Sequence, residues 1–299
     1  MSVYIQQYGS ELSFTSDAWA ILNPLELSIK SKIEKYGTPL RDWDISINYG
    51  IKTGCNDAFI IDGAKRAELI AADPKSDEII RPILRGRDIK RYGYDFADLW
   101  LINIECGSTN ANRCSLAPEE YIKNTYPAIY EHFIDIANRP TRGKGLKGRD
   151  DMGDYWWELR SCAYTNDFSK QKIAWASVGE TYYSLIDKDM YLLDTNYFFA
   201  CEHPEYFLAF LNSKLLTFWI NSKDLKLGSG GAYRHYKYNI EQLSLPEFDE
   251  GLYLILRDYI NQIIENNDQS YISKIDEIVY KAYHLTEEEI AFIENAFSC

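Results

Sequence analysis

The segment GIKTGCNDAFIID, residues 50–62, follows the alternating segment ISINY at residues 45–49, and together they indicate the kind of fold. In the first segment Ile45, Ile47 and Tyr49 alternate with polar residues, as in a half-buried strand, and residues 58–62 form a second apolar run. The turn-forming residues 53–57 between them predict a β-hairpin. Its glycines suit positive φ angles. The alternative is that the same loop presents Lys52, Thr53 and Asn56 to a polyanion.

Working outward, the sequence predicts a mixed α/β (α+β) fold, rich in β-structure in the middle, with flanking and C-terminal helices. Helices are expected over 24–36, with Asn23 as the N-cap, over 64–72, after Pro127 and over 204–220. Strands are expected over 100–104, 172–178, 182–186 and 197–201, with a strand exit at 243–246. We therefore expect an N-terminal linker and helix (1–40), a β-rich domain (41–246) and a C-terminal helical segment (247–299).

The C-terminal segment carries two apolar stripes at helical spacing, over 252–263 and 272–283, and a capping box made by Thr286 and Glu289. Such stripes must be covered by other apolar surface. Two interpretations are open: the stripes pack on the core of this chain, or they dock onto a partner protein.

The composition is that of a globular protein of 299 residues, with 46% hydrophobic residues. No apolar run is long enough to cross a membrane, and residues 1–16 lack the features of a signal peptide, so we expect a cytoplasmic location. The six cysteines are scattered without a CxxC pair, which favours free thiols over a metal site.

The net charge of −13 is unevenly distributed, because residues 247–299 hold 12 acidic and only 3 basic residues. Basic residues gather in three segments of the remaining chain: the first over 81–91, the second over 139–149 and the third over 223–237. Each could be an ordinary solvated face, but together they point to phosphate contacts and base recognition. The candidate DNA-binding residues are Lys52, Thr53, Asn56, Arg85, Arg87, Lys90, Arg91, Arg142, Lys144, Lys147, Arg149, Lys226, Tyr233, Arg234 and Lys237. Residues 139–154, which contain the second segment, are expected to form a long exposed loop.

No catalytic constellation is visible. The segment 50–56 is not a P-loop, because its Lys-Thr precedes the second glycine and a strand is expected to follow. The Asn/Asp-Pro-Pro-aromatic methyltransferase motif is absent, since Leu25 follows Asn23-Pro24. Asp224 and Lys226 match the D-x-K part of a nuclease site, but so short a match arises by chance. We expect no cofactor and no metal.

Several segments resemble, in order, the TaqI-like C-terminal specificity domain. They are GIKTGCNDAF (50–59), PILRGRDIKRY (82–92), WELR (157–160), LNSKL (211–215), LSLP (243–246), IDEIVY (275–280) and LTEEEI (285–290). This resemblance implies the target-recognition domain of an adenine-specific DNA methyltransferase or of a fused restriction-modification enzyme. It implies double-stranded DNA as a partner, with a methyltransferase domain or subunit as the catalytic part. The chain would then be a sequence-specific DNA-binding module and not a complete enzyme.

Two other classes of function stay open on the sequence alone. One is a divergent stand-alone nuclease that uses Asp224 and Lys226. The other is a protein-interaction scaffold whose acidic tail binds a partner.

Overall fold

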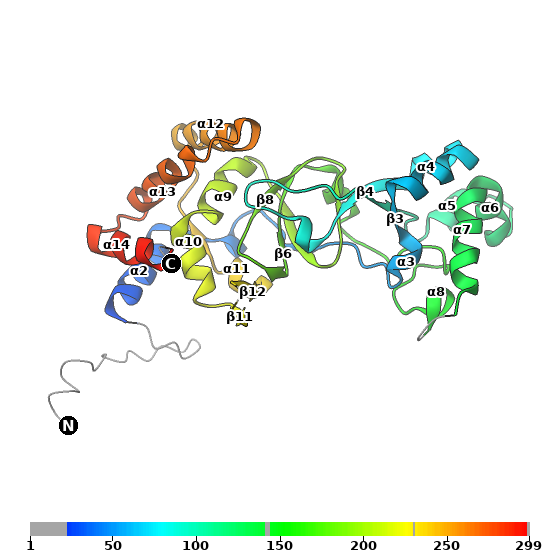
Figure 1. Cartoon of the computed structure of the whole chain (residues 1–299), viewed down its shortest axis with the longest axis horizontal. Coiled ribbons are helices and arrows are strands. Elements are labelled where there is room, and N and C mark those ends of the chain that lie inside the picture. The colour runs from blue at the N-terminus through cyan, green and yellow to red at the C-terminus, as the bar shows by residue number, and fades with distance from the viewer. Residues whose placement is uncertain (1–22, 141–143, 230, 298–299) are drawn as a thin grey trace, which may run out of the picture. The chain divides into compact units, whose positions relative to one another are not determined.

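The computed structural model describes residues 23–140, 144–229 and 231–297. Its helices and small sheets form a mixed α/β fold (Figure 1), as the sequence predicted. The chain divides into two compact units. The helical unit takes its described residues from 1–44, 205–225 and 238–299, and the sheet unit from 45–204 and 226–237. These units draw on separate parts of the chain, unlike the contiguous segments expected from sequence, because Leu245 pairs back with Thr38.

The helical unit begins with α2 (Pro24–Tyr36), where the predicted helix is confirmed. The Asn23 carboxamide accepts a hydrogen bond from the Glu26 amide at 2.9 Å, and Glu26 accepts one from the Asn23 amide at 2.8 Å. This capping box satisfies backbone donors that a helix leaves free at its N-terminus. After Gly37, β1 (Thr38–Pro39) pairs antiparallel with β13 (Ser244–Leu245). A Cβ on Gly37 would lie 2.6 Å from the Ser244 carbonyl carbon, so only glycine fits there.

The single helix predicted over 204–220 is wrong, because the chain forms α9 (Pro204–Leu211) and α10 (Lys214–Asn221). Ser213 interrupts the apolar run, and its hydroxyl accepts a hydrogen bond from the Leu216 amide at 3.3 Å as the N-cap of α10. The Asp276 carboxylate accepts another from the Lys214 amide at 2.8 Å. Both interactions satisfy amides of the first turn of α10, so the apolar run divides at the residue that can cap a new helix.

Three C-terminal helices complete this unit: α12 (Glu250–Asn266), α13 (Ser270–Ala282) and α14 (Glu287–Ala296), preceded by the short α11 (Lys237–Glu241). The predicted stripes are buried, with Leu256, Ile260, Ile275 and Val279 all 0% exposed. Helix α12 packs on α13, and α14 contacts α10 and α2. The first interpretation of the stripes is therefore confirmed for these residues, which belong to the core of their own unit.

The sheet unit contains two four-stranded sheets. The first has the order β2 (Asn48–Tyr49), β10 (Asn196–Ala200), β6 (Lys172–Ala176), β8 (Ser184–Ile186) and is antiparallel. The second has the order β3 (Ile60–Asp62), β5 (Leu99–Ile102), β4 (Ile80–Leu84), β9 (Tyr191–Leu192), with β4 and β9 parallel. The strands expected near 100, 172, 182 and 197 are all present.

The hairpin predicted over 45–62 is wrong. Strand β2 pairs with β10 and strand β3 with β5, while residues 56–59 form a helical turn, α3 (Asn56–Phe59). The Gly50 amide donates to the Asn196 carbonyl at 3.0 Å, and the Ile51 amide to the Leu192 carbonyl at 2.6 Å. Local periodicity marks a strand but does not reveal its partner, and here the partners are distant in sequence.

Helices cover one end of the sheet unit. Helices α4 (Gly63–Ala72) and α7 (Pro127–Asn138) lie where the sequence predicted them. Shorter helices α5 (Ser108–Asn112), α6 (Pro118–Thr125) and α8 (Gly145–Gly148) gather around α7 (Figure 1). Phe59 and Phe133 pack against each other at 5.0 Å between ring centroids inside this cluster. Within the described residues, no helix combines the length and apolarity that a membrane span requires.

Candidate nucleic-acid interface

The loop after β2 is built around Thr53, which is only 1% exposed. Its hydroxyl donates to the Asn56 side-chain oxygen at 2.6 Å and accepts from the Cys55 amide at 3.2 Å. Gly54 follows with φ +67°, a conformation that favours glycine. Thr53, a candidate contact from sequence, therefore shapes the loop from inside, whereas Lys52 and Asn56 remain exposed.

Lys52 belongs to a small charge network centred on Asp151. The Lys52 ammonium lies 3.1 Å from the Asp151 carboxylate, and the Arg160 guanidinium lies 3.2 Å from the same group. Both cations line a hollow of about 610 Å³ beside the loop, together with Tyr164 and Asp194. Burial raises the pKa of the Asp194 carboxyl. Sequence reasoning did not select Arg160, because only the fold brings it to Asp151.

The second basic segment is less open than the predicted loop. It contains the short helix α8, whose Leu146 is 1% exposed. Lys144 pairs with Asp150, and the exposed Lys147 lies over the Trp156 ring, 4.8 Å from its centroid. Arg142 lies outside the described residues. The expectation of an entirely exposed loop over 139–154 is wrong because α8 packs against α7.

Arg149 differs most from its predicted place, because it is 4% exposed. Its guanidinium donates to the backbone carbonyls of Leu146 at 3.0 Å and Asp151 at 3.1 Å, and also to those of Trp156 and Glu158. It lies over the Phe59 ring, 4.6 Å from the centroid. Burial lowers the pKa of Arg149 to about 10. Arg149 is therefore buried and holds the 146–158 backbone by hydrogen bonds, and it is not a surface cation.

The first basic segment contains one internal pair and two exposed cations, Arg87 and Lys90. Arg85 donates two side-chain hydrogen bonds to Asp88, at 2.7 and 2.9 Å. Although burial acts in the opposite direction, these bonds lower the pKa of Asp88. Arg87 is exposed on the 3-10 turn η3 (Gly86–Asp88). Lys90 lies 3.6 Å from Asp95, and the Arg91 guanidinium lies 5.3 Å from the Tyr92 ring centroid.

The third basic segment forms part of a small three-stranded sheet with the order β11 (Leu225–Leu227), β12 (Ala232–Arg234), β7 (Val178–Gly179). Strand β11 carries Lys226, and β12 carries Tyr233 and Arg234. The Lys237 ammonium instead donates to the Ile47 carbonyl at 2.8 Å.

Strand β7 also contacts η3, so the fold joins the first and third basic segments. Some of the candidate residues, joined by Val178 and Arg160, form two groups within the sheet unit. The groove group comprises Arg87 on η3, Val178 on β7 and Arg234 on β12, whereas Tyr233 stacks on the buried His235 ring. The loop group comprises Lys52, Lys144, Lys147 and Arg160. Asn56 accepts the Thr53 hydrogen bond and lines a hollow together with Arg85.

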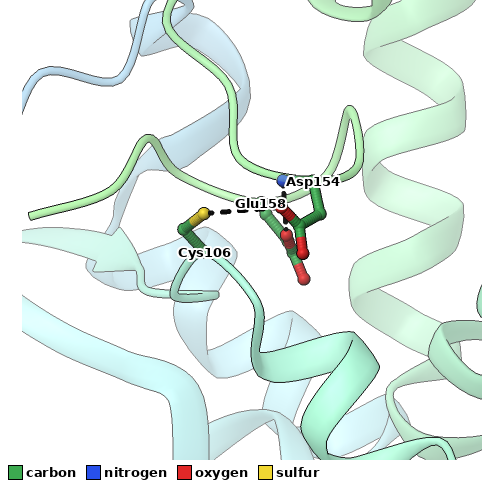
Figure 2. Close-up of side chains that lie close together, drawn as sticks. All are labelled: Cys106, Asp154 and Glu158. Atoms are coloured by element: carbon green, nitrogen blue, oxygen red, sulfur yellow. Dashed lines mark hydrogen bonds between the residues drawn. The ribbon is translucent and has the colours of Figure 1, made fainter.

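Figure 2 shows one further cluster, made of Cys106, Asp154 and Glu158, whose potential ligand atoms lie within 4.8 Å of one another. The Glu158 carboxylate is fully buried and accepts three backbone hydrogen bonds, from Gly107 at 3.1 Å, Thr109 at 3.0 Å and Asp154 at 2.9 Å. Burial raises the pKa of the Cys106 thiol, which disfavours the thiolate that a metal needs. These contacts give Glu158 a structural role at the N-terminus of α5.

Comparison with known proteins relates this arrangement to restriction-modification enzymes at the level of fold. No family model matches the sequence, and no curated protein does. The chain is similar to the Type IIL restriction-modification enzyme MmeI, whose structure was solved in complex with DNA, with a TM-score of 0.56 and 11% identity. It is also similar to the type IIG restriction endonuclease BpuSI, with a TM-score of 0.53 and 12% identity. The matches cover 86% and 87% of this chain but only 36% and 33% of those enzymes. The chain therefore has a fold found within restriction-modification enzymes and spans about a third of their length.

Proposed function

We propose that this chain is the sequence-specific DNA-recognition module of a bacterial restriction-modification system, of the TaqI-like specificity kind. The observation that carries the proposal is the fold likeness to MmeI, an enzyme solved with DNA, over 86% of this chain. At 11% identity the likeness concerns fold alone, so the argument for DNA must come from the surface of the chain itself.

The charge distribution supports this function. The chain as a whole is acidic, yet the groove group and the loop group place exposed cations in one unit. Cations near phosphates release condensed counterions, which supplies much of the affinity of a protein for DNA. The acidic residues of 247–299 belong to the helical unit, whereas both basic groups belong to the sheet unit.

On this proposal the chain does no chemistry itself and directs an adenine-specific methyltransferase domain or subunit to its site. The nuclease alternative is less favoured, because Asp224 is 7% exposed and its carboxylate accepts from the Asn239 side chain at 2.7 Å. The apolar stripes give no support to the scaffold alternative, since their central residues on α12 and α13 are covered within their own unit.

The test is a selection from duplexes that carry a randomised central region, using the full chain at physiological salt with magnesium and labelled S-adenosylmethionine. We expect enrichment of one sequence class, without cleavage and without methyl transfer by the chain alone. Retained DNA with no enriched sequence, or no retention at all, would contradict the recognition function. Methyl transfer or cutting by the pure chain would contradict its non-catalytic character.

A further inference from the structure

We infer that the groove group is the base-reading surface and enters the major groove, with Arg87 and Arg234 as the residues that determine specificity. This inference rests on the proposed function. It assigns contacts with base edges to the groove group and contacts with phosphates to the loop group.

The first argument is exposure. None of the residues in β7, β11 and β12 is buried, so this small sheet contributes nothing to either core. Val178 is 46% exposed, although an apolar side chain on a strand normally faces a core. The sheet is nevertheless anchored, since the His235 amide donates to the Ser177 carbonyl at 3.0 Å. A major groove admits a two-stranded β-ribbon, and the antiparallel pair β12–β7 is a ribbon of this kind.

The second argument is the pairing of charges. In the loop group Lys52, Lys144 and Arg160 each have a carboxylate partner. Arg87 and Arg234 make no ion pair with any residue that the structure describes. The acidic residue that follows β7 is Glu180, which raises the pKa of the Tyr182 phenol by hydrogen bonding. The two guanidiniums therefore keep their donors for a ligand, and a guanidinium binds O6 and N7 of guanine in a bidentate manner.

The third argument is the register between the strands. Arg234 lies directly opposite Val178 in the antiparallel pair β12–β7, so the two side chains share one face of the sheet. Contact between η3 and β7 adds Arg87 to the same neighbourhood. A guanidinium beside an apolar side chain matches the edge of guanine beside the methyl group of thymine. A surface for phosphates alone would not need the exposed valine.

The test compares the selected sequence profiles of Arg87→Lys, Arg234→Lys and a matched control, Arg160→Lys. Each change keeps the positive charge but removes the guanidinium fork. We expect each groove variant to lose roughly 5- to 150-fold of preference at one guanine position, with unchanged affinity for non-specific DNA. Arg160→Lys should leave the profile unchanged. All three side chains are exposed, so equal melting temperatures will confirm that the variants fold.

Failure of this inference is distinguishable from failure of the proposed function. If the unmodified chain selects no sequence, the proposed function fails. If the unmodified chain selects a sequence and both groove variants keep its sequence profile, only the inferred role of the groove group is refuted. A uniform loss of affinity for all sequences would also overturn the inference, because it would place Arg87 and Arg234 on phosphates.

Discussion

Replacement of Arg149 by methionine should destabilise the sheet unit without removing a DNA contact. Methionine retains much of the apolar stem but none of the donors, so four backbone carbonyls lose the Arg149 donor, and of these the Glu158 carbonyl keeps the Gly153 amide. Each buried carbonyl left unpaired costs about 1–3 kcal/mol. The lowered pKa of Arg149, about 10, shows that burial of the charge is itself costly, and its removal regains ~3 kcal/mol.

The net expectation for Arg149→Met is a loss of about 3–5 kcal/mol, the range found when one side of a buried charged network is removed. For a unit of this size the melting temperature should fall by roughly 6–20 °C. The assay is thermal unfolding of the full chain, followed by far-ultraviolet circular dichroism. The matched control is Arg160→Met, whose side chain is 53% exposed and should cost less than about 0.5 kcal/mol.

The same Arg149→Met variant distinguishes a buried, structural role of Arg149 from a role as a phosphate contact. At a temperature where the variant is folded, the dependence of its DNA affinity on salt should match that of the unmodified chain. An unchanged melting temperature with a flatter salt dependence would refute the reasoning. It would show Arg149 to be a phosphate contact, as the sequence alone suggested.

Three further outcomes are expected. Changing Lys144 and Lys147 to alanine should weaken binding to all DNA sequences and flatten the slope of log K against log salt by roughly 0.9 for each lost phosphate contact; an unchanged slope would mark a solvated face. Burial raises the pKa of Tyr126 and Tyr130 to about 12. Because the unfolded phenols ionise near 10, their contribution to stability should be complete below pH 10 and lost as the pH rises towards 12. Tyrosinate absorbance and melting temperature will report this loss, and ionisation of both residues near pH 10 in the folded chain would disprove it. Truncation after Pro246 should yield an aggregated or unfolded protein, because the removed helices cover the core of the helical unit; a soluble, cooperatively folding product would show the opposite.

Features set by neighbouring residues could be predicted from the sequence. The cap at Asn23, the capping box at Thr286 and the helix after Pro127 depend on residues within a few positions of each other, and all are present. Ser213 offered a signal of the same kind, because it is a capping residue inside an apolar run. The hydrophobic residues on both sides of Ser213 nevertheless predicted one continuous helix.

Features that depend on distant partners could not be predicted. Strand β2 pairs with β10, about 150 positions later in the sequence, and no local sequence pattern indicates that pairing. A run of cations identifies basic residues but does not say which of them the fold buries. The Arg149 guanidinium is buried and donates to four carbonyls, whereas Arg87 in the preceding basic segment stays exposed. For the same reason Arg160 became a candidate only through its contact with Asp151.

Sequence recognition by this chain can be measured as the ratio of two dissociation constants for the full chain. One is measured for the duplex enriched by selection and the other for a scrambled duplex of equal length and composition, at about 0.15 M salt. We predict that the enriched duplex binds at least about 10³-fold more tightly, the lower end of the range for specific DNA-binding proteins. Equal dissociation constants for the two duplexes would contradict the claim that this chain recognises a DNA sequence.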